Sequence, residues 1–212
     1  MKLEFEMDKV LDNFFVFEGL DGSGKSTQLH LLGDKLRSRG FDVETTFEPT
    51  DNAIGRVVRQ VLRREIVTTP QALALLYSAD RHDHLYNSDY GIEKKTKEGT
   101  IVLSDRYFYS SFAYQTVQLD FDYVKAINNY PHPRCVIYLD ASVSLCMERI
   151  NSRGDVKELF EKEEYLKCVK ENFEKAFSAL PEGVKLIRIP AIMNEMEASE
   201  LVFKEIEGYI NL

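Results

Sequence analysis

The chain has 212 residues, 44% of them hydrophobic and 29% charged, an ordinary mixture for one folded domain with a substantial core. Its formal net charge of −8 argues against a nucleic-acid polymer as the main partner, because such binding relies on basic patches. The apolar runs are far shorter than a membrane span, and acidic residues interrupt the N-terminal stretch where a signal peptide would need an apolar core. Three scattered cysteines fit a reducing compartment, so we expect a cytoplasmic protein with no membrane partner.

Apolar runs alternate with helical patterns along the whole chain. The run at 14–17 predicts a buried strand that ends at a glycine-rich loop. The segment 25–39 then carries leucines at helical spacing, and Gly40 is a typical residue at a helix end. The same alternation continues, with strands predicted at 42–47, 100–104, 135–139 and 185–189 and helices at 54–63, 70–97, 142–153, 161–179 and 193–210.

Strands that are apolar throughout and alternate with helices predict a parallel sheet covered on both faces. We therefore expect an α/β fold of three layers, in which a five-stranded parallel sheet lies between helices. No repeat or linker divides the chain, so one domain is predicted over 1–212. Ligands of such sheets bind at the carboxyl ends of strands, where this chain places Glu18-Gly19, Asp105 and Asp140.

The first predicted strand leads into a loop that fits the pattern G-x-x-x-x-G-K-[ST]. Its glycines let backbone N–H groups surround phosphate oxygens, and the start of the next helix adds a positive end. Lys25 is expected to reach the β- and γ-phosphates of ATP, and the Ser26 hydroxyl to coordinate Mg²⁺. The strand before the loop and the helix after it favour this interpretation over a chance match in a flexible turn. The predicted ATP phosphate site consists of Gly19, Leu20, Asp21, Gly22, Ser23, Gly24, Lys25, Ser26 and Thr27.

Asp105 ends an apolar strand, which is the usual position of the second acidic residue in phosphate-loop enzymes. A carboxylate there acts on Mg²⁺ directly or through water. An aspartate after a strand is also a common helix N-cap. We favour the metal role, so Ser26 and Asp105 form the predicted Mg²⁺ site.

Four segments taken together resemble the thymidylate kinases, the enzymes that phosphorylate dTMP with ATP. They are FEGLDGSGKSTQ, FEPTDNAIGRVVRQVL, LLYSADRHDHL and LSDRYFYSSFAYQ, and the similarity continues more loosely through VIYLD and ERINSRGD. The Asp-Arg-Tyr followed by S-S-x-A-Y-Q is the most specific part. The resemblance implies the fold of the phosphate-loop nucleoside monophosphate kinases, with a short lid at about 149–161, and a homodimer. It also implies the reaction: transfer of the ATP γ-phosphoryl group to dTMP, which gives dTDP and ADP in dTTP synthesis.

The resemblance also implies roles on the acceptor side. Arg59 would hold the acceptor's monophosphate, for which a guanidinium fork is well suited. Arg106 would lie beside the transferring phosphoryl group, where spreading negative charge needs a fixed cation. Asp21 would reach the acceptor's 3′-hydroxyl, and Glu18 would have a supporting role at best. The other implied dTMP-binding residues are Tyr77 against thymine, Arg81 at the base edge, Tyr107 on the sugar, and Ser111 and Gln115 on the base.

Arg149 and Arg153 lie one helical turn apart at the start of the implied lid. In the family branch that has glycine at the position of Gly22, lid arginines supply the positive charge that the phosphate loop lacks, so Arg153 is the leading lid arginine and Arg149 the second. The chain departs from the family in two places. Many relatives carry a further arginine where Lys157 is the nearest cation, and a glycine-rich stretch where this chain has TVQLDFD after residue 115.

The implied chemistry is in-line transfer between two polyanions, with Mg²⁺ as the cofactor. An acceptor phosphate is already anionic at neutral pH, so no strong general base is required. Two alternatives stay open: a kinase for another nucleoside monophosphate or for a deoxynucleoside, and a phosphate-loop switch without an acceptor. The switch would give no reason for several arginines to converge. The predicted catalytic residues are Lys25, Asp105, Arg106 and Arg153.

Overall fold

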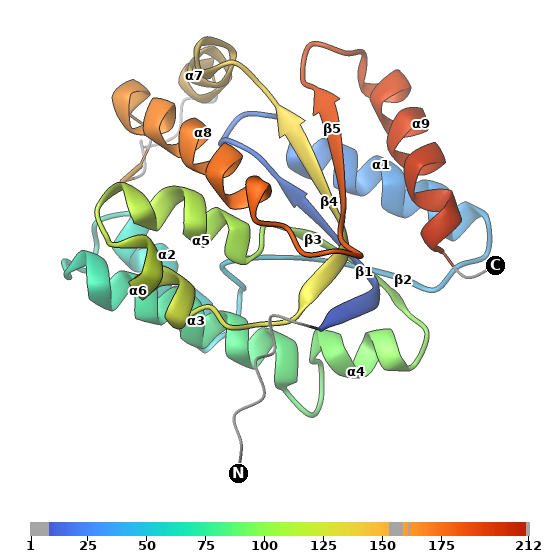
Figure 1. Ribbon diagram of the computed structural model, residues 1–212, viewed down its shortest axis with the longest axis horizontal. Helices are drawn as coiled ribbons and strands as arrows, with labels where there is room; N and C mark the ends of the chain where they lie inside the picture. The colour runs from blue at the N-terminus through green and yellow to red at the C-terminus, as the bar shows by residue number, and fades with distance from the viewer. Residues whose placement is uncertain (1–8, 153–158, 161, 211–212) are drawn as a thin grey trace.

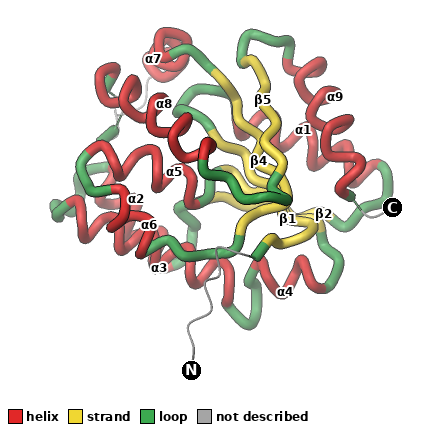
Figure 2. The backbone as a smooth tube through the Cα atoms, viewed as in Figure 1, coloured by secondary structure: helices red, strands yellow, loops and turns green. Residues whose placement is uncertain are grey.

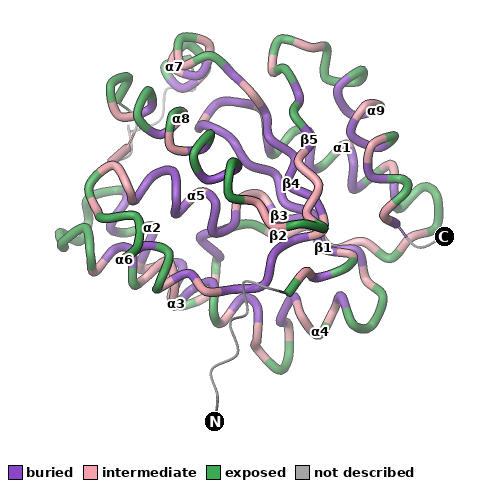
Figure 3. The backbone as a smooth tube through the Cα atoms, viewed as in Figure 1, coloured by how far each residue is buried: buried purple, intermediate pink, exposed green. Residues whose placement is uncertain are grey.

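A computed structural model describes residues 9–152, 159–160 and 162–210 of the chain (Figure 1). Its centre is one five-stranded sheet in the order β2-β3-β1-β4-β5, and every neighbouring pair of strands is parallel. Strands β1, β3 and β4 are largely buried, whereas the edge strands β2 and β5 are only partly buried (Figure 3). Their bounds are β1 Val10–Glu18, β2 Val43–Phe47, β3 Ile101–Asp105, β4 His132–Asp140 and β5 Lys185–Pro190.

Helices cover both faces of the sheet, as Figure 2 shows. Alternate side chains of β1 point to opposite faces: Phe15 and Phe17 pack with α1 and α9, whereas Phe14 and Val16 pack with α5 and α8. These contacts confirm the predicted three-layer α/β fold. The helices are α1 Lys25–Ser38, α2 Ala53–Leu62, α3 Pro70–Tyr86, α4 Ile92–Lys97, α5 Phe108–Tyr114, α6 Phe121–Ala126, α7 Val143–Ser152, α8 Glu163–Ser178 and α9 Glu195–Ile206, with 3₁₀ turns η2 Gln115–Val117 and η3 Glu207–Tyr209.

Two of the differences between the predicted and the observed element bounds have clear physical reasons. Strand β1 begins at Val10, because a bulge with Asn13 at φ 59° lets the strand continue through a polar pair that interrupts the apolar run. The helix predicted over 70–97 is broken between α3 and α4. Gly91 belongs to that break: a Cβ there would lie 2.5 Å from the carbonyl oxygen of Asn87, so only glycine fits.

The segments that follow β1, β2 and β3 begin next to one another at one edge of the sheet. Strand β1 lies between β3 and β4, and the amide of Arg106, just after β3, donates to the carbonyl of Phe17 in β1 at 2.9 Å. The amide of Glu48, just after β2, donates to the carbonyl of Asp105 at 3.0 Å. The phosphate loop and the segments after β2 and β3 therefore begin side by side.

Within the described part of the chain, none of the helices has the length and apolar character needed to cross a membrane.

Candidate active site

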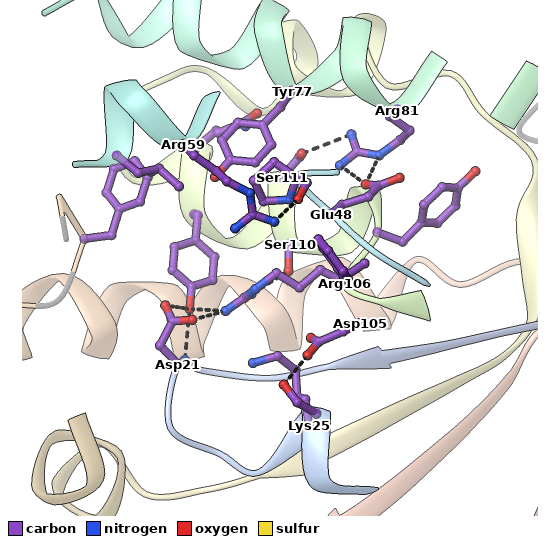
Figure 4. A pocket seen from close by; sticks show the side chains of 18 of the residues that line it. Asp21, Lys25, Glu48, Arg59, Tyr77, Arg81, Asp105, Arg106, Ser110 and Ser111 are labelled. Atoms are coloured by element: carbon purple, nitrogen blue, oxygen red, sulfur yellow. Dashed lines mark hydrogen bonds and ion pairs between the residues drawn. The ribbon is translucent and has the colours of Figure 1, made fainter. Parts of the chain in front are cut away.

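A cavity of about 310 Å³ lies at this edge, bordered by the phosphate loop, the ends of β2 and β3, and helices α2, α3 and α5 (Figure 4). It joins most of the predicted ATP and dTMP residues in one space. The predicted residues that line it are Asp21, Gly22, Gly24, Lys25, Ser26, Thr27, Arg59, Tyr77, Arg81, Asp105, Arg106, Tyr107, Ser111 and Gln115. The residues that line it without having been predicted are Phe47, Glu48, Pro49, Leu62, Ser110, Tyr114 and Phe160.

The phosphate loop has the backbone that its glycines allow. Gly22 (φ 81°) and Gly24 (φ 99°) are left-handed, and α1 begins directly after Gly24. The Lys25 ammonium donates to the carbonyl of Gly19 at 3.2 Å and to that of Leu20 at 2.9 Å. Burial and the charge of Arg106 lower the pKa of Lys25, although nearby carboxylates oppose the shift. The ammonium is thus held under the loop, on the side where the sequence predicts the ATP phosphates.

Helix α7 fills the space beside Gly22. A Cβ at this position would lie 2.8 Å from the carbonyl oxygen of Cys146. Arg149, on the same helix, donates to the carbonyl of Gly22 at 3.0 Å and to that of Ala191 at 3.4 Å. Arg149 thus contacts the loop backbone but is absent from the described lining of the cavity. Arg153, the leading predicted lid arginine, lies outside the described residues, as does Lys157.

Ser26 and Asp105 lie side by side, as the sequence predicted for a metal site. The Ser26 hydroxyl donates to Asp105 Oδ2 at 2.6 Å. The other carboxylate oxygen, Oδ1, is buried and has no hydrogen-bond partner among the described residues. A hydroxyl and a carboxylate oxygen are ligands that Mg²⁺ prefers, and Mg²⁺ usually takes few protein ligands beside phosphate and water.

Asp21 leaves the phosphate loop towards the acceptor side of the cavity. Its carboxylate accepts hydrogen bonds from the Arg106 guanidinium and from the Tyr114 hydroxyl, the latter at 3.0 Å (Figure 4). Burial alone would raise the pKa of Asp21, but the charges of Arg106 and Lys25 and these hydrogen bonds lower it to about 2. Asp21 is therefore an anion at neutral pH, placed between the donor loop and the acceptor side.

Arg106 is supported from a second direction by the first turn of α5. Its guanidinium donates to the Ser110 hydroxyl at 2.8 Å. That hydroxyl donates to Glu18 at 2.6 Å, and Glu18 also accepts from the backbone amides of Tyr107 and Ser110. Burial raises the pKa of Glu18 to about 7, although the charge of Arg106 and these hydrogen bonds oppose the rise.

Arg81 reaches the cavity from a buried ion pair. Its Nε and its NH2 group each lie 2.8 Å from Glu48 Oε2, and both side chains are almost fully buried. The other Glu48 oxygen lies 3.1 Å from His84 Nδ1. The Arg81 NH1 group donates to the Ser111 hydroxyl at 3.2 Å and to Asn128. Every nitrogen of this guanidinium is therefore fixed by a named acceptor.

The remaining predicted acceptor residues take different positions. Arg59 donates to the carbonyl of Pro49, and its Nε lies 3.4 Å from Asp51 Oδ1. Gln115 is buried, and within the described chain its Oε1 has no hydrogen-bond partner. The Tyr107 ring is also buried, and its hydroxyl donates to the carbonyl of Pro131 at 3.0 Å.

Glu48 and Tyr114 were not predicted as site residues. Glu48 follows β2 at the carboxyl end of the sheet, the same signal that identified Asp105, so the sequence did offer a reason to include it. Tyr114 lies within the A-Y-Q of the most family-like segment, but it takes its contacts with Asp21 and Arg106 to distinguish it from a core aromatic. Asp140 also ends a strand, yet it pairs with Lys170 at 2.8 Å and is not one of the described residues that line the cavity.

Comparison with known proteins identifies the family of this chain. Residues 17–199 match the family described as thymidylate kinase. The chain belongs to the thymidylate kinase family. A putative thymidylate kinase of Treponema pallidum is 39% identical over 186 residues, which cover 86% of this chain and 88% of that protein. A probable thymidylate kinase of Thermococcus gammatolerans is 37% identical over 207 residues, covering 93% of this chain and 95% of that protein. The resemblance to thymidylate kinases predicted from sequence is therefore confirmed.

Proposed function

We propose that this protein transfers the γ-phosphoryl group of ATP to dTMP, giving dTDP and ADP, as a step in dTTP synthesis. One observation carries the proposal. A single cavity joins a phosphate loop to a set of arginine, tyrosine and amide side chains that suit a nucleoside monophosphate. A nucleotide switch without an acceptor would need the first half of this cavity only.

The cations are arranged for transfer between two anions. Lys25 lies under the loop for the ATP phosphates, and Arg59 lies across the cavity for the acceptor's monophosphate. Arg106 lies between these two groups in the chain of contacts from Asp21 to Ser110, which suits a cation beside the transferring phosphoryl group. Catalysis would come from positioning and charge neutralisation, because the acceptor phosphate needs no general base.

Magnesium would be held by the Ser26 hydroxyl and, directly or through water, by the Asp105 carboxylate, whose free Oδ1 supports this role. When bound with ATP, Mg²⁺ neutralises phosphate charge as it develops. Ser26 at the start of α1 and Asp105 at the end of β3 already contact each other, which would let them hold one ion together.

The base would be recognised on the side of the cavity formed by α3 and α5. Gln115 Oε1 is buried and has no hydrogen-bond partner among the described residues. It is an acceptor suited to the N3–H of thymine. Ser111 and Arg81 are joined to each other at 3.2 Å and would face the base edge, with Tyr77 against its ring. Asp21 would accept from the 3′-hydroxyl of the sugar.

A panel of nucleoside monophosphates, assayed with ATP and Mg²⁺, tests the function. We expect dTMP to give the highest kcat/KM, with dUMP as the nearest competitor because it lacks only the methyl group. A clear preference for another monophosphate, or ATP hydrolysis that does not depend on any acceptor, would refute the proposal.

Three further proposals come with this function and rest mainly on the family resemblance. The chain would form one domain over 1–212 with a lid at about 149–161, in which Arg153 and Arg149 are the candidate lid cations. It would act in the cytoplasm, which its three scattered cysteines suit. It would form a homodimer, which light scattering after size-exclusion chromatography would test.

A further inference from the structure

Glu18, the last residue of β1, forms hydrogen bonds with the start of α5. Glu18, which has no exposed surface, accepts the backbone N–H of Tyr107 at 2.9 Å and that of Ser110 at 3.1 Å on Oε1. Its Oε2 accepts the Ser110 hydroxyl at 2.6 Å. Glu18 also directly precedes the phosphate loop. One buried carboxylate therefore joins the donor side of the site to the segment that carries Arg106.

The Ser110 hydroxyl has one hydrogen, and the direction of this hydrogen decides what Arg106 meets. Because the hydrogen is donated to Glu18, the oxygen lone pairs stay available to the Arg106 NH1 group at 2.8 Å. A guanidinium can only donate hydrogen bonds, so a serine hydrogen turned towards Arg106 would oppose it. When ionised, as it is above its pKa of about 7, the Glu18 carboxylate thus orients Ser110 as an acceptor for Arg106.

Arg106 needs this support because its backbone is strained. Its φ of 75° lies in the left-handed region, which is unfavourable for an arginine. The guanidinium is held at NH2 by Asp21 and Tyr114 and at NH1 by Ser110. Substrate binding is expected to compete for Asp21, whereas the Ser110 hydroxyl is held by Glu18, which is not among the described residues that line the cavity.

We propose that Glu18 is a positioning residue for phosphoryl transfer, which fixes the Arg106 guanidinium through the hydroxyl of Ser110. The inference rests on the proposed function, in which Arg106 is the cation beside the transferring group. Glu18 acts through Ser110 and is not among the described residues that line the cavity. Its effect should therefore appear in kcat and be coupled to that of Ser110.

A double-mutant cycle tests this link. Ser110→Ala removes the hydroxyl, and Glu18→Gln keeps the shape but replaces one acceptor oxygen with an NH₂ donor. We expect each single variant to lower kcat about tenfold or more, since each loses a hydrogen bond that involves a charged group. The KM for ATP should change by less than about twofold, and the double variant should be no more than about twofold slower than Ser110→Ala, because the link is already broken.

Ser78→Ala is the matched control. This serine hydroxyl on α3 is also partly buried and contacts the carbonyl of Ile127 and the hydroxyl of Tyr130, outside the cavity. It should keep the wild-type kcat. Wild-type kcat in Ser110→Ala, or losses that simply multiply in the double variant, would overturn the proposal. If Glu18→Gln does not fold, the comparison of Ser110→Ala with Ser78→Ala still decides it.

A structure separates this inference from the proposed function. Absence of dTMP phosphorylation by the wild-type enzyme would refute the function. A crystal structure of Ser110→Ala, which needs no turnover, would then test the link itself. A displaced Arg106 guanidinium would support the link, and an unmoved one would overturn it.

Discussion

The buried pair of Arg81 and Glu48 should be essential for stability and for dTMP binding, and the two effects can be separated. Glu48→Ala would leave the Arg81 guanidinium almost fully buried with only the neutral acceptors Ser111 and Asn128. Removing one partner of a buried ion pair typically costs about 3–5 kcal/mol. In a domain of this size each kcal/mol corresponds to about 2–4 °C in Tm, so we expect a fall of about 6–20 °C.

The measurement is thermal unfolding by circular dichroism, with Glu44→Ala as the control. Glu44 lies on β2, the strand that ends just before Glu48, and its ion pair with Lys95 at 2.5 Å is partly exposed, so its loss should cost less than about 1 kcal/mol. Equal Tm values for Glu48→Ala and Glu44→Ala would refute the reasoning about burial.

A charge-free replacement of the pair separates stability from recognition. The double variant Glu48→Leu and Arg81→Met removes both charges, and such exchanges are often neutral for stability. We expect much of the lost Tm to return, while dTMP affinity measured by calorimetry stays at least about tenfold weaker, since Arg81 no longer meets the base. Wild-type dTMP affinity in this double variant would show that Arg81 does not contact the nucleotide.

Three other variants test separate parts of the site. Arg106→Ala should lower kcat about 10³-fold or more while ATP affinity by calorimetry stays close to wild type, and unchanged turnover with dTMP would contradict the assignment. Ser26→Ala should raise the Mg²⁺ concentration needed for half-maximal rate, since one metal ligand is lost, and an unchanged Mg²⁺ dependence would argue against a metal contact there. The free energy of unfolding of Glu18→Gln should increase relative to that of wild type as pH rises from about 5 to 8. Native Glu18, with its pKa raised to about 7, keeps a proton that the unfolded chain already releases near 4.5, so the wild-type free energy of unfolding falls through this range. Glutamine does not titrate, so the variant escapes this loss. A pH-independent difference in urea unfolding between the two proteins would refute this ionisation.

The fold was predictable because its signals are local. Strands β1, β3 and β4 contain apolar runs bounded by polar residues, and the alternation of strands with helices indicates a parallel sheet. The prediction was wrong where an irregularity in strand pairing overrides a local sequence signal. The polar pair before Phe14 suggested a strand end, but a bulge at Asn13 carries the strand past it.

The site was predictable only in part. The phosphate loop is a contiguous motif, and Asp105 and Arg106 belong to a recognisable segment. The bonds that orient these residues join distant parts of the chain: Asp21 meets Tyr114, and Glu18 meets Ser110. No sequence spacing encodes such pairs, because they arise from the order of strands in the sheet.

The hydrogen bond from Arg106 to the carbonyl of Phe17 has a consequence for motion in this enzyme. It continues the pairing of β1 with β3 at the centre of the sheet, so the phosphate loop and Arg106 cannot separate unless that pairing opens. Opening a central strand pair approaches global unfolding in free energy. We therefore expect the phosphate loop and Arg106 to move as one unit, and any motion that admits or releases nucleotides to occur in the segments around them.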